Sequence, residues 1–173
     1  MKKPIFIVPV QFGGVASALL IVLFVVLFYM GRHPMGIPIV FDVRFVILPL
    51  FMVIAMKDFR DNKNNNTLHF WQGLSVGFVT LLVISFFMSL FIIFFVAVDQ
   101  DFLQIYIEER TNLLLEHQAQ LTESISEEAF QLQLDKLPLT TSFDLAIDYF
   151  FKTLGIGVFL NIIIAILLRK QPN

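Results

Sequence analysis

The stretch FWQGLSVGFVTLLVISFFMSLFIIFFVAV, residues 70–98, contains no charged side chain and is apolar over almost its whole length. A bilayer core about 30 Å thick requires roughly 20 helical residues to cross it. Since a backbone in lipid must satisfy its own hydrogen bonds, an apolar stretch of this length forms a helix there. Adding the preceding His69, we expect a membrane-spanning helix over residues 69–98.

Three further apolar segments predict spans at residues 10–30, 38–58 and 143–168. The chain is 57% hydrophobic and 15% charged, which is typical of membrane proteins rather than of soluble globular domains. The first span is expected to be retained rather than cleaved as a signal peptide, because its strongest apolar run follows the small residues 16–18. We therefore predict an all-α membrane protein, residues 1–173, forming a single domain of four transmembrane helices.

The region between the third and fourth spans, residues 99–141, is the one long hydrophilic segment. Phe102, Tyr106 and Leu113 share one face of a helical projection, which predicts an amphipathic helix continuous with the third span. Ser124 and Glu127 have capping-box spacing, so a second helix is expected from about residue 125. This predicts a helical hairpin whose apolar stripe packs on itself, lies on lipid headgroups or meets a partner.

The distribution of Lys and Arg predicts how the chain is oriented, since short cytoplasmic loops are enriched in them. Seven of the twelve would share one side with both termini, close to the spans: Lys2, Lys3, Lys57, Arg60, Lys63, Arg169 and Lys170. We therefore expect a multi-pass membrane protein with both termini cytoplasmic. The hairpin is then extracytoplasmic.

The charged, asparagine-rich stretch at residues 57–73, KDFRDNKNNNTLHFWQG, is interpreted as the cytoplasmic turn between the second and third spans. Asparagine readily adopts turn conformations, and Asn66 or Thr67 is expected to cap the next helix. A catalytic or nucleic-acid site is disfavoured here. The net charge of −2 also gives no clustered cationic surface for nucleic acid.

Small residues recur at four-residue spacing in the third span, at Gly73, Gly77, Ser85 and Ser89. Small side chains let membrane helices approach closely, so this face is predicted to pack against another helix. Packing within one chain is the simpler interpretation, and a homo-oligomer or a membrane-protein partner is the alternative. Asn161 is expected to hydrogen-bond to another helix.

Charged residues within or beside spans are costly and are functional candidates. Five of them are expected near the outer interface and form the candidate polar cluster: Asp42, Arg44, Asp144, Asp148 and Lys152. Asp148 and Lys152 are four residues apart, so they are expected to pair on one helix face. The cluster is either structural pairing with snorkelling side chains or a site for a polar substrate or ion.

The sequence nominates no catalytic, cofactor-binding or metal-binding residues. Cysteine is absent, and His33, His69 and His117 lack the spacing of a metal site. Phosphate-binding loops, dinucleotide fingerprints and nucleophile elbows are also missing. No cofactor is expected.

The order of these features resembles the membrane family called domain of unknown function 4199, common among Bacteroidetes. The resemblance rests on the basic turn and Gly-containing entry to the third span, MKDFRDNKNNNTLHFWQGLSVGF (residues 56–78). It continues through VDQDFLQIYIEER (98–110) and through Gly155 before the basic end Arg169 and Lys170. The resemblance implies a four-span integral membrane protein, with a hydrophilic loop between spans three and four, in the bacterial inner (cytoplasmic) membrane. It implies no activity.

Three classes of function remain open for this chain. An accessory or scaffold subunit of a membrane assembly is favoured, because the sequence has packing faces and a partner-sized hairpin but no recognisable chemistry. A small transporter or channel component would use the outer charge cluster. A membrane enzyme acting on a lipid-linked substrate would need acids and bases that converge at the interface.

Overall fold

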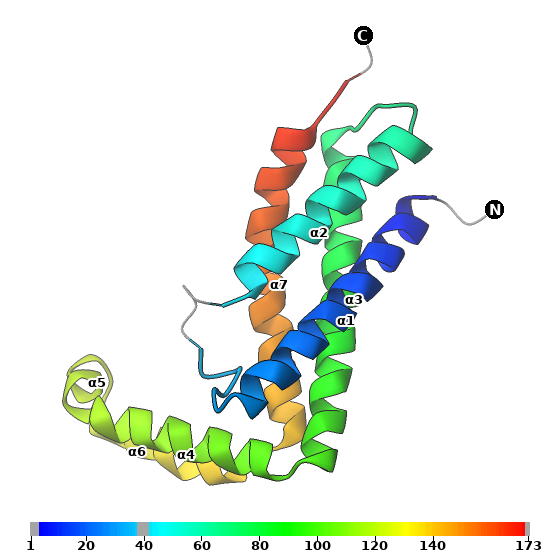
Figure 1. Cartoon of the computed structure of the whole chain (residues 1–173). Coiled ribbons are helices and arrows are strands. Elements are labelled where there is room, and N and C mark those ends of the chain that lie inside the picture. The colour runs from blue at the N-terminus through cyan, green and yellow to red at the C-terminus, as the bar shows by residue number, and fades with distance from the viewer. Residues whose placement is uncertain (1–3, 38–41, 172–173) are drawn as a thin grey trace.

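The computed structural model describes residues 4–37 and 42–171, and this part of the chain is helical with no strand (Figure 1). The bundle contains α1 (Pro4–Tyr29), α2 (Arg44–Asp58), the π-helix η2 (Phe59–Lys63), α3 (Phe70–Val98) and α7 (Ser142–Leu168). Between α3 and α7 lie α4 (Asp101–Glu116), α5 (Gln118–Ser124), α6 (Glu127–Lys136) and the 3-10 helix η3 (Leu137–Leu139). The predicted all-α class is confirmed for the described residues.

Three of the helices, α1, α3 and α7, are long and apolar enough to cross a membrane, with 26, 29 and 27 residues. They correspond to the spans predicted at residues 10–30, 69–98 and 143–168. Helix α3 packs against both α1 and α7, and α2 contacts all three (Figure 1). These apolar helices are compatible with a membrane protein.

The predicted span at residues 38–58 is not confirmed as a full-length span. Helix α2 begins only at Arg44 and has 15 residues, a length of about 22 Å; residues 38–41 lie outside the described part. Asp42 lies two residues before the helix, and its Oδ1 accepts the backbone N–H of Arg44 at 2.9 Å. Because the first N–H groups of a helix lack partners within it, this bond stabilises a helix that starts here.

The expected continuation of α3 into the next helix is wrong. Asp99 has extended backbone dihedrals (φ −122°, ψ 94°), and the chain then leaves the bundle as α4 (Figure 1). The Tyr29 hydroxyl donates to Asp99 Oδ2 at 3.2 Å, which ties this bend to the end of α1. We call α4, α5 and α6 together, residues 101–136, the arm.

The helix predicted from about residue 125 corresponds to α6, which starts slightly later, at Glu127. Ser126, rather than Ser124, caps α6, since its Oγ accepts the Ala129 N–H at 3.3 Å. The intervening α5 changes the direction of the chain between α4 and α6 (Figure 1).

Phe102, at the start of α4, joins the arm to the bundle. Its side chain is fully buried, and its ring centroid lies 5.5, 5.1 and 5.3 Å from those of Phe24, Phe28 and Phe95. Aromatic pairs at such separations contribute beyond the area they bury. The junction between α1, α3 and α4 is therefore an aromatic cluster.

The turn before α3 has the asparagine conformations that its sequence predicts. Asn65 and Asn66 have positive φ values of 50° and 58°, which asparagine tolerates better than most residues. The predicted cap at Asn66 or Thr67 is wrong: His69 is the N-cap, and its N–H donates to Gln72 Oε1 at 3.0 Å. Backbone bonds between Leu68 and Lys170 hold this turn against the end of α7.

Candidate functional site

The small residues of α3 face neighbouring helices inside the chain. A side chain added at Gly77 would meet Asn161 Oδ1, and its Cβ would lie 2.6 Å from Met56 Cε. Ser89 Oγ donates to Ala146 O of α7 at 3.0 Å. Gly73 faces Ala165, and Ser85 is fully buried, with no hydrogen-bond partner for its Oγ within the described residues. The stripe therefore contributes to packing of α3 in the bundle.

Asn161 makes the interhelical bond that the sequence predicts. Its Nδ2 donates to Leu74 O of α3 at 2.9 Å. The same side chain lies against Gly77, so the absence of a Cβ there lets the amide of α7 reach the α3 backbone. Small residues and interhelical hydrogen bonds are the usual means of association between membrane helices.

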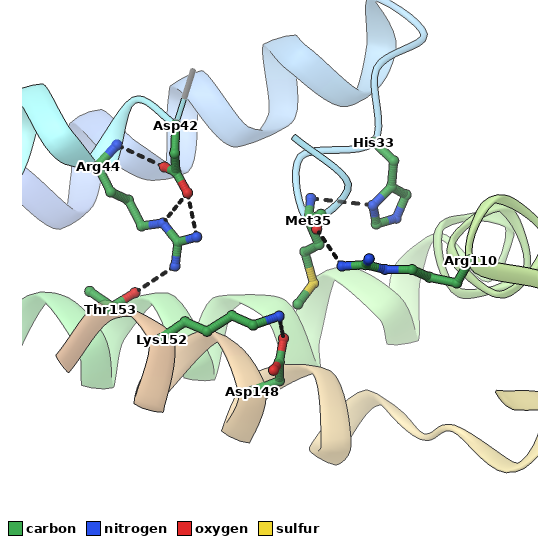
Figure 2. Close-up of polar contacts among 8 residues, drawn as sticks. All are labelled: His33, Met35, Asp42, Arg44, Arg110, Asp148, Lys152 and Thr153. Carbon is green, nitrogen blue, oxygen red and sulfur yellow. Dashed lines mark hydrogen bonds and ion pairs between the residues drawn. The ribbon is translucent and has the colours of Figure 1, made fainter. Parts of the chain in front are cut away.

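Asp42 and Arg44 form a buried ion pair at the beginning of α2 (Figure 2). Both residues are 9% exposed. Arg44 Nε donates to Asp42 Oδ2 at 2.7 Å, Nη2 donates to the same oxygen, and Nη1 donates to Thr153 Oγ1 at 3.0 Å. The guanidinium also lies over the Tyr149 ring, 4.5 Å from its centroid. The free-energy cost of burying the pair is thus offset by these hydrogen bonds and by the contact with the aromatic ring.

This pair contacts α7 well beyond the first turns of that helix. Thr153 comes eleven residues after Ser142, the first residue of α7. At a rise of about 1.5 Å per residue, the contact with Arg44 is about 16 Å along α7. No pattern in the sequence singles out Thr153 or Tyr149, because their contacts with Arg44 depend on where α2 begins.

The other three residues of the predicted cluster occupy separate positions on α7. Lys152 Nζ and Asp148 Oδ2 form an ion pair at 2.6 Å (Figure 2). Asp144 instead caps α7: its Oδ2 accepts from Thr141 N at 2.8 Å and from Thr141 Oγ1 at 2.6 Å. The five residues therefore form two ion pairs and one helix cap rather than a single ionic cluster.

His33, which the sequence did not nominate, is buried between the bundle and the arm. Its Nδ1 accepts the Met35 N–H at 3.3 Å, so Nε2 carries the proton and donates to Phe102 O at 3.1 Å. Arg110 of α4 donates to Met35 O at 3.4 Å (Figure 2). Burial, with a smaller contribution from the Arg110 charge, lowers the pKa of His33 to about 4. The imidazole is therefore neutral at pH 7.

Stability should fall on acidification because of His33. Its pKa is about 4 in the folded chain, against 6.5 normally, so the unfolded chain binds more protons between these values. The neutral ring contributes its full stability above pH 6.5. As the pH falls from 6.5 to about 4, the free energy of unfolding should decrease by about 3 kcal/mol. Unfolding in detergent, followed by circular dichroism from pH 7.5 to 4, measures it.

The matched variants for this experiment are His33→Asn and His117→Asn. His33→Asn should remove most of the pH dependence, whereas His117→Asn should retain it, because His117 is exposed on the arm. Equal pH dependence in the two variants would assign the effect to other groups.

Two neighbouring cavities lie on this side of the bundle, and the Asp42–Arg44 pair lines one of them. The inner one, about 30 Å³, is lined by residues that include Asp42, Arg44 and Tyr149, and has room for about one water. The outer one, about 380 Å³, is lined by residues that include Arg32, His33 and Glu109. Both are also lined by Leu27, Ile37 and Val43. We call the outer cavity the vestibule.

The described residues bring together no group of three or more His, Asp or Glu side chains suited to a metal ion. The charged side chains form ion pairs instead, Asp42 with Arg44 and Asp148 with Lys152, and Arg44 also donates a hydrogen bond to Thr153.

Comparison with known proteins gives one family. The sequence model described as "Protein of unknown function (DUF4199)" matches residues 11–170, nearly the whole chain. No curated protein and no solved structure matches the chain.

Proposed function

The chain belongs to the DUF4199 family of proteins of unknown function, and we propose that it is an accessory or scaffold subunit of a membrane assembly. In this proposal α1, α3 and α7 cross the bacterial inner membrane, and the segment that ends in α2 returns the chain from the outer side to the cytoplasmic side. Both termini are cytoplasmic, and the arm is an extracytoplasmic helical hairpin.

The orientation is supported by basic residues gathered at one end of the bundle. Lys57, Arg60 and Lys63 lie in the last turn of α2 and in η2. Lys170 is bonded through its backbone to Leu68, just before α3, so the end of α7 lies beside the turn that follows η2. Basic residues beside spans favour the cytoplasmic side.

The observation that carries the accessory role is that charged side chains on the helices of the bundle pair with one another. Asp42 pairs with Arg44, and Asp148 pairs with Lys152. Acid–base catalysis requires groups with a proton to give or to take at a reacting atom, and ion-paired side chains are poorly suited to this. The pairing supports a structural role for the bundle.

The arm supplies a surface for a partner. Its sequence, residues 101–136, has eight acidic and two basic side chains, and Leu113, Leu115 and Leu132 are 47%, 50% and 54% exposed. Exposed leucines among charges of one sign are typical of protein contact surfaces. A basic, partly apolar surface of another membrane protein fits the arm.

One cysteine variant tests both the orientation and the partner. The chain has no cysteine, so Gln120→Cys in the exposed α5 places a single thiol on the arm. A membrane-impermeant maleimide that carries a photo-crosslinker should label intact spheroplasts. Illumination should then give a defined covalent product with a second protein, identified by mass spectrometry.

Lys63→Cys at the opposite end of the bundle is the matched control and should be labelled only after lysis. Labelling of Lys63→Cys but not of Gln120→Cys in intact spheroplasts would invert the topology. If Gln120→Cys is labelled but the protein stays alone after illumination, the accessory role fails. A product containing two copies of this chain would instead identify a homo-oligomer.

A further inference from the structure

We infer that the vestibule and the Asp42–Arg44 pair together form a binding site for a zwitterionic ligand, one that carries both an anionic group and an ammonium group. The inference goes beyond the accessory role, because it concerns a small ligand inside the bundle rather than a protein partner at the arm.

The side chain of Arg44, the first residue of α2, reaches Thr153 about 16 Å along α7. The chain before it, residues 30–37 and 42–43, is not regular helix. Within the hydrocarbon region, irregular backbone is tolerated where protein buries it or where it lines a water-filled cavity. The vestibule, with Gly31, Gly36 and Ile37 in its wall, is such a cavity.

The half-exposed ion pair on α7 is independent evidence of a polar environment at this depth. The side chain of Asp148 is 38% exposed and that of Lys152 is 48% exposed. Charges that face lipid hydrocarbon are costly, and they normally face the bundle interior or water. Lys152 is three residues from Tyr149, which lines the inner cavity, so the two share a region of the α7 surface. This side of the bundle is therefore accessible to water.

The charges of the site are balanced, and this favours a ligand with both signs. Arg32 and Glu109 line the vestibule, and Arg44 and Asp42 line the inner cavity. A net anion would meet Asp42 and Glu109 unfavourably, and a net cation would meet the two guanidinium groups in the same way. A zwitterion in the vestibule can place its anionic group toward Arg32 and its ammonium toward Glu109. Arg44 and Asp42 act on it from the inner cavity, which has room for about one water.

The volume also suits a small ligand. The vestibule of about 380 Å³ lies in the lower part of the range usual for small-molecule pockets. A phosphoethanolamine group carries the required pair of charges, either as the headgroup of a membrane lipid or as a free compound. The chemistry is the same for both, so the two sources must be separated by experiment.

Native mass spectrometry of the full chain in detergent micelles tests the site with three probes: phosphatidylethanolamine, phosphatidylglycerol and free phosphoethanolamine. Phosphatidylethanolamine should bind at least about tenfold more tightly than phosphatidylglycerol, which corresponds to about 1.4 kcal/mol. If free phosphoethanolamine competes or binds alone, the ligand is soluble. If only the lipid binds, the ligand is a headgroup.

The variant Asp42→Asn with Arg44→Gln removes both buried charges together, so no unpaired charge remains, and it should weaken binding about tenfold. If its circular dichroism shows misfolding, Arg32→Gln with Glu109→Gln at the vestibule replaces it. Arg60→Gln with Asp61→Asn removes an ion pair outside the site and should bind as the wild type does.

Equal binding of the two lipids, unchanged binding by the site variants, or no adduct with any probe would overturn the inference. A second protein chain bound in place of the lipid, and lost in the same variants, would also overturn it. These outcomes are distinct from the cross-linking result at Gln120, which bears on the accessory role alone.

Discussion

Replacing Gly77 by alanine is expected to destabilise the bundle by about 3 kcal/mol, at the upper end of the usual range for overpacking. The new methyl group would overlap the Asn161 amide and lie 2.6 Å from Met56 Cε. Relief requires Asn161 to move, which breaks its bond to Leu74 O. Its Oδ1 already lacks a partner within the described residues, so the displaced amide would lose its one interhelical bond.

The measurement is unfolding in mixed micelles with increasing sodium dodecyl sulfate, followed by circular dichroism. Gly155→Ala in α7 is the matched control, since nothing lies within 4 Å of a Cβ added there. Because alanine favours a helix over glycine by up to about 1 kcal/mol, the control should be neutral or slightly stabilising. Similar destabilisation by both substitutions would show that close approach at Gly77 does not limit packing.

The apolar helices could be predicted from sequence because hydropathy and length depend on neighbouring residues only. The segment at residues 69–98 and helix α3, Phe70–Val98, agree almost to the residue. The four-residue spacing of Gly73 and Gly77 likewise predicts a packing face before any partner is known. The identity of that partner, α7, depends on the whole chain.

The start of α2 could not be predicted in this way. An average over residues 38–58 remains apolar, although Asp42 and Arg44 interrupt it. Asp42 bonds to the backbone N–H of Arg44 where the helix begins, and the Arg44 side chain bonds to Thr153, a residue 109 positions away. The bend between α3 and α4 is similar, since Asp99 bonds to Tyr29 from 70 positions away. Both features therefore involve polar contacts between residues that are distant in sequence.

In the candidate site, too, contacts between residues close in sequence could be predicted and contacts between distant residues could not. The pairing of Asp148 with Lys152 follows from helical spacing and is present. His33 offered no such signal, because its partners are the Phe102 carbonyl and the backbone of Met35. Its ring centroid lies 4.2 Å from that of Phe102, so the aromatic cluster determines its burial.

Replacing Phe102 by alanine is therefore expected to produce the largest single loss of stability, about 4 kcal/mol, as for other fully buried phenylalanines. The ring is 0% exposed and contacts Phe24, Phe28, Phe95 and His33. Its removal opens a cavity where α4 joins the bundle. Hydrogen exchange should then increase in α4 before it increases in α3.

The same substitution should also change the titration of His33. With the Phe102 ring gone, water reaches the imidazole, so its pKa should rise from about 4 toward the ordinary 6.5. The folded-state pKa of His33 would then lie closer to that of the unfolded chain, so less stability should be lost between pH 6.5 and about 4. Phe94→Ala, at a site 69% exposed on α3, is the control and should leave both the α4 exchange and the pH dependence unchanged. If Phe102→Ala behaves as Phe94→Ala does, the arm is held to the bundle by contacts other than this aromatic cluster.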